Sequence, residues 1–270
     1  MKTRIISAAV ALVILAAVLL LFETPVLDVA IALVSVIAVY EVINAVGLAK
    51  NRGFLAVCAV FAAFFSSTYY QTFSSIASFV DYVFAGIILL FVLADKDNIK
   101  FNDAAAAFFG VIIIPKIFSM ILLFRNYGST IAYFLVMLSL AVAWFNDTCA
   151  YFSGYFFGKR KLCPEISPKK TVEGAIGGVF GDVILCCAFA LIFGMVTGYS
   201  VNWVNLVIFL PVGAVAAILG DLCFSAIKRQ LNIKDYGNIM PGHGGVLDRF
   251  DSWLFVVPLL YMWNIYFPFI

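Results

Sequence analysis

Long apolar runs separated by short polar joints make up most of this 270-residue chain. Nine of these runs are close to the length of about 17–25 residues that a helix needs to cross the hydrocarbon core of a bilayer. The runs are 5–22, 26–46, 54–71, 76–94, 104–124, 129–149, 174–197, 203–223 and 253–269. The pattern therefore predicts an all-α fold, in which about nine transmembrane helices form a polytopic integral membrane protein.

Composition supports the same fold class. Hydrophobic residues are 64% of the chain, whereas a soluble domain is typically about 45–50% apolar. A soluble fold of this length could not bury so much apolar surface, so lipid must be part of the solvent. The first run resembles a signal peptide, but Glu23-Thr24-Pro25 lacks a small-residue cleavage site, so we expect a retained first span. The net charge of +2 is too small for a broad nucleic-acid-binding surface.

The basic residues predict the orientation. If the N-terminus is cytoplasmic, 15 of the 17 Lys and Arg residues fall on the cytoplasmic side, as the positive-inside rule requires. Both long polar loops, 150–173 and 224–252, are then cytoplasmic, in a protein of the cell's inner membrane. We divide the chain into N-terminal membrane helices (1–125) and a C-terminal catalytic membrane region (126–270) that carries both loops. The two regions are also compatible with one continuous domain.

The last polar loop concentrates charge and glycine in a chain with only 12% charged residues. Residues 225–251 read SAIKRQLNIKDYGNIMPGHGGVLDRFD. Asp248 and Asp251 are three residues apart and share a face if the segment is helical, and Asp221 in the preceding span could join them. Mg²⁺ typically takes one or two carboxylates together with phosphate oxygens and water. The pattern favours an Mg-bound polyphosphate site, and the alternative is a solvated loop with internal salt bridges.

The first polar loop contains ISPKKTVEG, in which Lys169 and Lys170 are adjacent cations suited to phosphate. Thr171 and Glu173 could cap or line the start of the next helix. The alternative is a basic anchor without catalytic function. Four glycines follow at small-xxx-small spacings, which predicts close packing of that helix against a neighbour. They are Gly174, Gly177, Gly178 and Gly181.

Carboxylates inside apolar segments are costly and usually functional. Asp147 and Asp221 lie at the predicted cytoplasmic ends of their spans, and Glu41 lies about one turn inside the end of the second span. Asp81 lies toward the outer side, where a structural role is expected. Asp182 could be a buried hydrogen-bonding residue, and Lys116 is a candidate partner. His243 is the single histidine, and both a structural role and a role in the site are consistent with its position.

The last loop resembles the signature of the phosphatidate cytidylyltransferases, also called CDP-diglyceride synthases. That signature has Ser-x-x-Lys-Arg, then Lys-Asp, and then Pro-x-His-Gly-Gly-x-x-Asp-Arg-x-Asp, and this chain matches each of those positions. ISPKKTVEG and the segment around Asn146-Asp147 look like two further family blocks. The resemblance covers the chain from Trp144 onward.

The resemblance implies cytidylyl transfer from CTP to phosphatidate, giving CDP-diacylglycerol and pyrophosphate. It also implies Mg²⁺, admits a monovalent cation such as K⁺, and suggests a homodimer in membrane lipid whose site faces the cytoplasm. We assign catalytic roles to Asp221, Asp248, Lys228, Arg249 and His243. The predicted metal ligands are Asp221, Asp248, Asp251 and Asp147. Contacts with CTP and the lipid phosphate are assigned to Ser167, Lys169, Lys170, Thr171, Glu173, Ser225, Arg229, Lys234, Asp235, Gly244 and Gly245.

Two other functions are consistent with parts of this pattern. A related CTP-dependent lipid enzyme, such as a polyprenol kinase, would share the cytoplasmic loop. A transporter of phosphorylated solutes would also place Asp and Lys in the membrane. The chain has no inverted repeat and concentrates its charge on one membrane face, which favours the enzyme.

Overall fold

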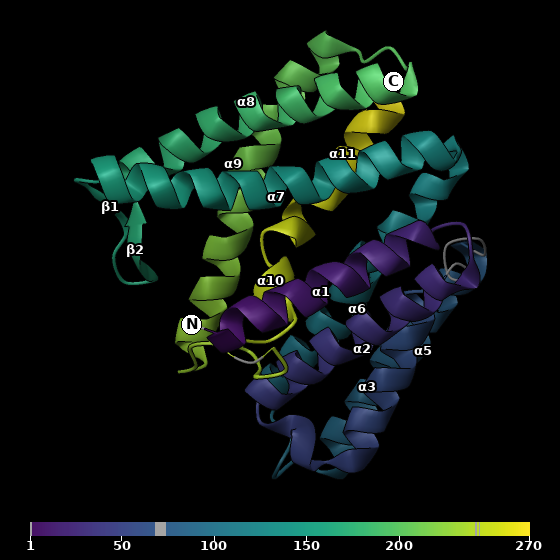
Figure 1. Ribbon diagram of the computed structural model, residues 1–270. Helices are drawn as coiled ribbons and strands as arrows, with labels where there is room; N and C mark the ends of the chain where they lie inside the picture. The colour runs from purple at the N-terminus through teal and green to yellow at the C-terminus, as the bar shows by residue number, and fades with distance from the viewer. Residues whose placement is uncertain (1, 68–73, 241, 243) are drawn as a thin grey trace. The chain divides into compact units, whose positions relative to one another are not determined.

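The computed structural model describes residues 2–67, 74–240, 242 and 244–270, and most of them are helical (Figure 1). The helices are α1 (Lys2–Leu20), α2 (Pro25–Ala45), α3 (Arg52–Phe65), α5 (Ser74–Ala94), α6 (Phe101–Leu123), α7 (Ser129–Phe157), α8 (Val172–Thr197), α9 (Trp203–Gln230), α10 (Leu247–Phe250) and α11 (Trp253–Tyr266). Two strands, β1 (Lys161–Cys163) and β2 (Ser167–Thr171), form an antiparallel hairpin in which Lys161 pairs with Thr171.

The helices confirm the predicted all-α membrane class. Each predicted span overlaps one helix, although α3 ends at Phe65 and residues 68–71 of the predicted span 54–71 lie outside the described residues. Five segments of the described chain are long and apolar enough to cross a membrane: Pro25–Ala45, Phe101–Tyr127, Ser129–Phe157, Val172–Thr197 and Trp203–Gln230. Shorter apolar helices account for the other predicted spans. The number of spans and the membrane face of the site stay predictions.

Two helices extend well beyond the spans predicted from hydropathy. α7 continues to Phe157 and α9 to Gln230, so much of what was predicted as loop is helix or hairpin. At about 1.5 Å per residue, α7 is longer than the roughly 30 Å of a hydrocarbon core. Hydropathy marks the lipid-embedded part of a helix, whereas backbone hydrogen bonding continues into the polar residues. Lys228 and Arg229 therefore lie on the last turn of α9.

Contacts group the chain into two compact units. The first comprises residues 1–123 and 233–249, and the second comprises 124–232 and 250–270. The segment 233–249, which the sequence assigned to the C-terminal region, thus packs with the N-terminal helices. The reason is a hydrogen-bonded contact with α2, because two backbone N–H groups of this segment bind the carboxylate of Glu41.

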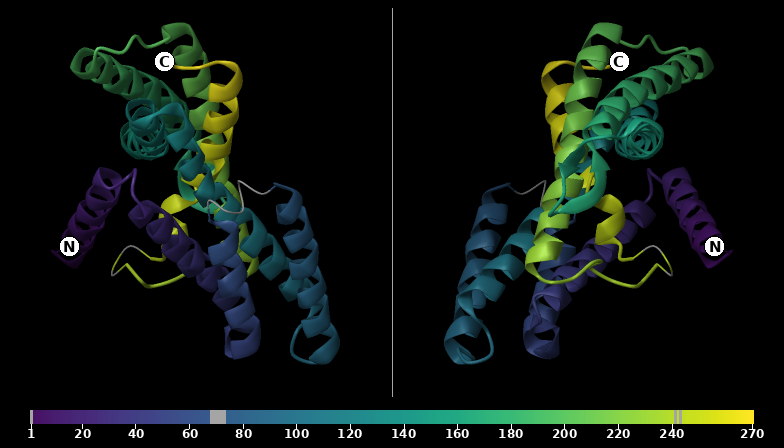
Figure 2. Two further views of the ribbon diagram at one scale, coloured as in Figure 1. Left: turned by 90° about the vertical axis from the view of Figure 1, so that its right-hand side faces the viewer. Right: turned by 90° about the vertical axis from the view of Figure 1, so that its left-hand side faces the viewer.

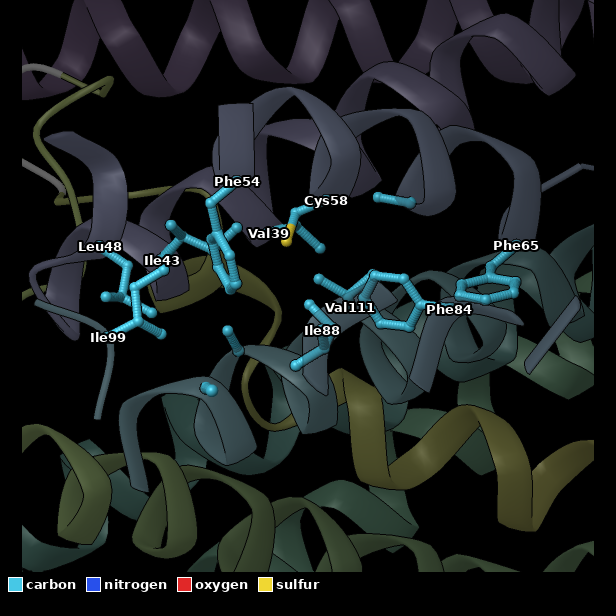
Figure 3. Close-up of a cluster of buried hydrophobic side chains, with 13 residues drawn as sticks. Val39, Ile43, Leu48, Phe54, Cys58, Phe65, Phe84, Ile88, Ile99 and Val111 are labelled. Carbon is cyan, nitrogen blue, oxygen red and sulfur yellow. The ribbon is translucent and has the colours of Figure 1, made fainter. Parts of the chain in front are cut away.

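Aromatic side chains fill the core of the first unit. Figure 2 shows α2, α3, α5 and α6 as neighbouring helices, and the close-up in Figure 3 shows Phe54, Phe65 and Phe84 among the buried side chains between them. The rings of Phe65 and Phe84 meet edge to face at 5.8 Å, an arrangement that aromatic pairs favour. α5 and α6 are also joined by an ion pair, in which Nζ of Lys116 lies 2.8 Å from Oδ2 of Asp81. This structural role for Asp81 agrees with the sequence prediction.

The suggested pairing of Lys116 with Asp182 is wrong. Lys116 pairs with Asp81 and also lies over the ring of Phe65, 5.3 Å from its centre. Asp182 belongs to the second unit, where its Oδ1 accepts the S–H of Cys186 at 3.3 Å. Sequence alone gives no pairing between spans, since every apolar helix offers several faces.

Glycines bring α7 and α8 into close contact, which confirms the predicted packing face. A Cβ on Gly174 would lie 2.8 Å from the carbonyl oxygen of Ala150, and one on Gly178 would lie 2.9 Å from the Cβ of the same residue. Gly177 and Gly181 face Ser153 and Cys149 just as closely. Without a hydrophobic driving force in lipid, such backbone approach is what lets two helices associate. The two helices meet where the hairpin joins them (Figure 1).

We predict that Gly178→Val will separate α7 from α8, because the added carbons have no space. Overpacking of this kind typically costs about 1–3 kcal/mol. The measurement is the unfolding midpoint of the detergent-solubilised protein, with Gly86→Val as the control, since nothing lies within 4 Å of a Cβ at Gly86. Equal midpoints for the two variants would contradict the packing role.

Candidate active site

A cavity of about 520 Å³ lies among α7, α8, α9 and the hairpin. It brings together five residues that the sequence assigned to the site: Asp147, Lys169, Lys170, Thr171 and Asp221. Asn146, Tyr151 and Tyr155 of α7 also line it. Cations, carboxylates and aromatic rings therefore share one space within the second unit.

The geometry of α7 explains which of its residues line the cavity. Residues four apart lie on one face of a helix. Asp147, Tyr151 and Tyr155 form such a row, and the two tyrosine rings stack with centres 6.4 Å apart. The neighbouring row, which begins at Asn146 and runs to Gly154, packs against the glycines of α8. One side of α7 is thus held by packing while the adjacent side presents polar groups.

The central interaction in the cavity is an ion pair between β2 and α9. Nζ of Lys170 lies 2.5 Å from Oδ2 of Asp221, and each side chain is 24% exposed. Oδ1 of Asp221 accepts the hydroxyl of Ser225 at 3.0 Å. The pair keeps both charges satisfied in a partly buried site, and both groups point toward the space that a ligand would fill.

A second ion pair lies in the last turn of α9, where the Nζ atom of Lys228 is 3.7 Å from Oδ2 of Asp251. Both side chains are buried. Burial raises the pKa of Asp251 to about 7; the negative charges of Asp221 and Asp147 add to this, and Lys228 opposes it. The charges of Asp221 and Asp147 thus disfavour ionisation of Asp251, and a bound cation would stabilise its ionised form.

Gly220 allows the turn that carries Asp251 to lie against α9. A Cβ at this position would be 2.6 Å from the carbonyl oxygen of Asp251 and 3.1 Å from the Cα of Ser252. The hydroxyl of Ser252 in turn donates to Oδ2 of Asp147 at 3.4 Å. This close approach links the start of α11 to both α9 and α7.

Several predicted site residues have structural contacts and do not line the cavity. Glu173 accepts the N–H groups of Lys159 and Arg160, which fixes the end of α7. Arg229 donates from Nε to the carbonyl oxygen of Ile166 at 3.2 Å.

Thr171, which does line the cavity, also caps α8 by accepting the N–H of Gly174, as the sequence predicted. The cavity lining also omits Ser167, Ser225, Lys228 and Asp251.

The other described residues of the predicted site belong to the first unit. Oδ2 of Asp248 accepts the N–H of Tyr236 at 2.8 Å and that of Gly245 at 2.9 Å. Gly244 has φ of +90°, which only glycine adopts readily. Lys234, Asp235 and Arg249 are exposed. His243, assigned a catalytic role from the sequence, lies outside the described residues.

The carboxylates fit a hard divalent ion that shares its coordination with a substrate. Within the described part of the chain, no three side chains of His, Cys, Asp or Glu gather closely enough to hold a metal by themselves. Mg²⁺ does not require three, because it takes one or two carboxylates with phosphate oxygens and water. Asp147 and Asp221 line the cavity and Asp251 lies near them, so one or two of these carboxylates suit such a cation.

Asn146 was not among the predicted site residues. Its side chain is fully buried, lines the cavity, and has no hydrogen-bond partner at Oδ1 or Nδ2 among the described residues. An unsatisfied buried polar group costs about 1–3 kcal/mol, so such an amide is expected to serve a ligand or a water molecule. Its position directly before Asp147 was the only sign of this role in the sequence, and the sequence prediction named the carboxylate of Asp147 alone.

Comparison with known proteins decides the family. A model of the cytidylyltransferase family matches residues 2–267. The chain belongs to the cytidylyltransferase family. The relatives include the phosphatidate cytidylyltransferases of Thermotoga maritima, 32% identical over 97% of this chain and 95% of the relative, and of Staphylococcus haemolyticus, 32% identical over 96% and 97%. That of Bacillus subtilis is 40% identical over 66% of this chain and 65% of the relative.

The raised pKa of Asp251 predicts how the stability of the folded protein depends on pH. The pKa is about 7 in the folded protein and about 3.9 in an unfolded chain. The folded state therefore binds the extra proton, and stability falls as the pH rises from about 4 to 7, by at most about 1.4 kcal/mol per pH unit. We expect Asp251→Asn to flatten this dependence in melting temperatures measured without Mg²⁺.

The control for that experiment is Asp97→Asn, which removes an exposed carboxylate from the same protein. It should follow the wild-type pH profile. A wild-type profile as flat as that of Asp251→Asn would show that Asp251 is not protonated on folding.

Proposed function

We propose that this protein transfers the cytidylyl group of CTP to phosphatidate, giving CDP-diacylglycerol and pyrophosphate. The observation that carries the proposal is the cavity in which Lys170 and Asp221 face each other, beside Lys169 and Asp147. Lysines suit a triphosphate and a lipid phosphate, and carboxylates suit a metal bound to them. Membership of the cytidylyltransferase family and the names of its relatives support the same reaction.

The reaction needs no protein nucleophile. An oxygen of the phosphatidate phosphate forms a bond to the α-phosphorus of CTP, and the bond from that phosphorus to the bridging oxygen of pyrophosphate breaks. The obstacle is the repulsion between two anions. Catalysis then consists mostly of positioning and charge neutralisation, as in other transfers at phosphorus.

The proposed cofactor is Mg²⁺, held by Asp221 with Asp147 or Asp251 close by. When bound, it would neutralise charge on the triphosphate and on departing pyrophosphate. Asp248 is given a metal-binding role from its sequence motif, and K⁺ beside Mg²⁺ remains part of the proposal on the resemblance alone.

Lys170 and Asp221 balance each other's charge in the cavity. In the structure each charge is satisfied by the other. With CTP and a metal ion bound, Lys170 would hold a phosphate group and Asp221 would hold the metal. The exchange replaces one ion pair with two, so that neither charge is left unpaired in the partly buried site.

The amide of Asn146 supplies a neutral contact in the same cavity. It can donate from Nδ2 and accept at Oδ1, so it would suit a polar group of the substrate that offers both an acceptor and a donor. The stacked rings of Tyr151 and Tyr155 add aromatic surface beside it. These groups are the proposed means of orienting the substrate.

The proposed setting is the inner membrane, with the N-terminus and the site at the cytoplasmic face, in a homodimer. The distribution of Lys and Arg supports this orientation. Single cysteines introduced at Lys159 or Lys161 should react with membrane-impermeant reagents only after cells are opened. Labelling in intact cells would invert the topology.

The reaction itself is tested with purified protein, phosphatidate, Mg²⁺ and CTP labelled at the α or the γ phosphate. Label from the α position should enter the lipid, and label from the γ position should leave in pyrophosphate. Lipid labelled from the γ position would identify a lipid kinase instead. Absence of lipid labelling under all metal conditions would contradict both enzymes and favour a transporter.

Two variants separate the roles of the central ion pair. Lys170→Ala should raise the CTP concentration required for half-maximal rate by about tenfold, the effect of one charge-assisted contact worth about 1.4 kcal/mol. Asp221→Asn should lower the maximal rate by a factor of about 100 or more and weaken the Mg²⁺ dependence. Equal effects of both variants on CTP alone would contradict the metal role of Asp221.

A further inference from the structure

Glu41 is a buried carboxylate from the first half of the chain, and the reaction proposed above does not use it. It lies near the end of α2 and is 1% exposed. Oε1 accepts the N–H of Val246 at 2.9 Å, and Oε2 accepts the N–H of Leu247 at 2.8 Å. Both oxygens are thus engaged by the backbone that leads directly into Asp248.

The protein makes room for this carboxylate with two glycines. A Cβ at Gly237 or at Gly245 would collide with Oε1 of Glu41. The two glycines lie on either side of the turn, one before and one after the isolated bridge between Met240 and Gly244. The loop therefore folds around Glu41 as well as being bound by it.

Asp248 holds the same turn from the other side. Its Oδ2 accepts the N–H of Gly245 at 2.9 Å and of Tyr236 at 2.8 Å. Of the three consecutive N–H groups at residues 245 to 247, the first is therefore bound by Asp248 and the next two by Glu41. Two buried carboxylates, 207 residues apart in sequence, share the task of fixing one short stretch of backbone.

We infer that Glu41 is a positioning residue, which sets the backbone of residues 244–248 and thereby aims the carboxylate of Asp248. The inference rests on the proposed metal-binding role of Asp248. Each oxygen of Glu41 accepts a backbone N–H, so the role inferred for it is to hold this backbone and not to bind substrate or metal. A charged acceptor is suited to this task, since hydrogen bonds to ionised groups are about twice as strong as neutral ones.

The structure gives a reason why a neutral replacement should fail. In Glu41→Gln one oxygen can still accept an N–H, but the NH₂ group would face the other N–H. The turn must then move, and a displacement of about 1 Å can cost on the order of 100-fold in rate. A shift of the carboxylate of Asp248 should appear in the maximal rate and in the Mg²⁺ requirement, with little change in the CTP requirement.

The experiment compares wild-type protein with Glu41→Gln and Gly237→Ala in the labelled-CTP assay. Both variants should lower kcat by about 10–100-fold and raise the Mg²⁺ concentration for half-maximal rate. Gly237→Ala disturbs Glu41 without removing its charge, so the double variant should be little worse than either single one. Glu23→Gln, an exposed carboxylate just before α2, is the control and should behave as wild type.

A second measurement separates positioning from loss of fold. Amide hydrogen exchange should rise at Val246 and Leu247 in Glu41→Gln, while the exchange of α2 and α6 stays as in wild type. Unchanged kcat and Mg²⁺ dependence would overturn the inference, and so would a loss of kcat that only matches a loss of folded protein. If wild-type protein transfers no label, the proposed function fails, and unchanged exchange at the two amides would then overturn the role of Glu41 separately.

Discussion

Charge placed in or beside an apolar helix must be matched by a partner, and most of the polar structure of this protein follows from that constraint. Lys116 is matched by Asp81, Lys170 by Asp221 and Lys228 by Asp251. Glu41 is matched by two backbone N–H groups. Because an uncompensated buried charge costs several kcal/mol, each of these pairs fixes which faces of the helices meet. The ion pair in the cavity also leaves two groups that a charged substrate can recruit.

The cavity exists because packing and polarity are assigned to different faces of α7. One row of residues fits into the glycine face of α8, where a side chain larger than hydrogen would collide. The adjacent row carries Asp147 and two tyrosines into the open space. Close contact on one side thereby holds the polar side chains at a fixed distance from α9. The site thus depends on the close helix packing that these glycines allow.

The pattern of residues along the chain did not predict which residues far apart in sequence would contact one another. The pairing of Lys116 with Asp81, the role of Glu41 and the buried amide of Asn146 each depend on which helix faces approach one another. The membership of residues 233–249 in the first unit is a further example. In each case the residue type was visible in the sequence, while its partner was chosen by packing.

The amino-acid sequence alone predicted the membrane class, the approximate position of nearly every helix and the segments that carry the charge, because apolar length and the clustering of Lys, Asp and Gly are properties of contiguous residues. It also determined the family, since the spacing of the polar residues from Ser225 to Asp251 is a local pattern. The tertiary structure was needed to show that Lys170 meets Asp221, that Glu173 and Arg229 bind backbone groups, and that Glu41 holds the turn before Asp248. Those contacts join residues from separate helices and loops, and their geometry depends on side-chain volume and close backbone approach, which no linear pattern encodes.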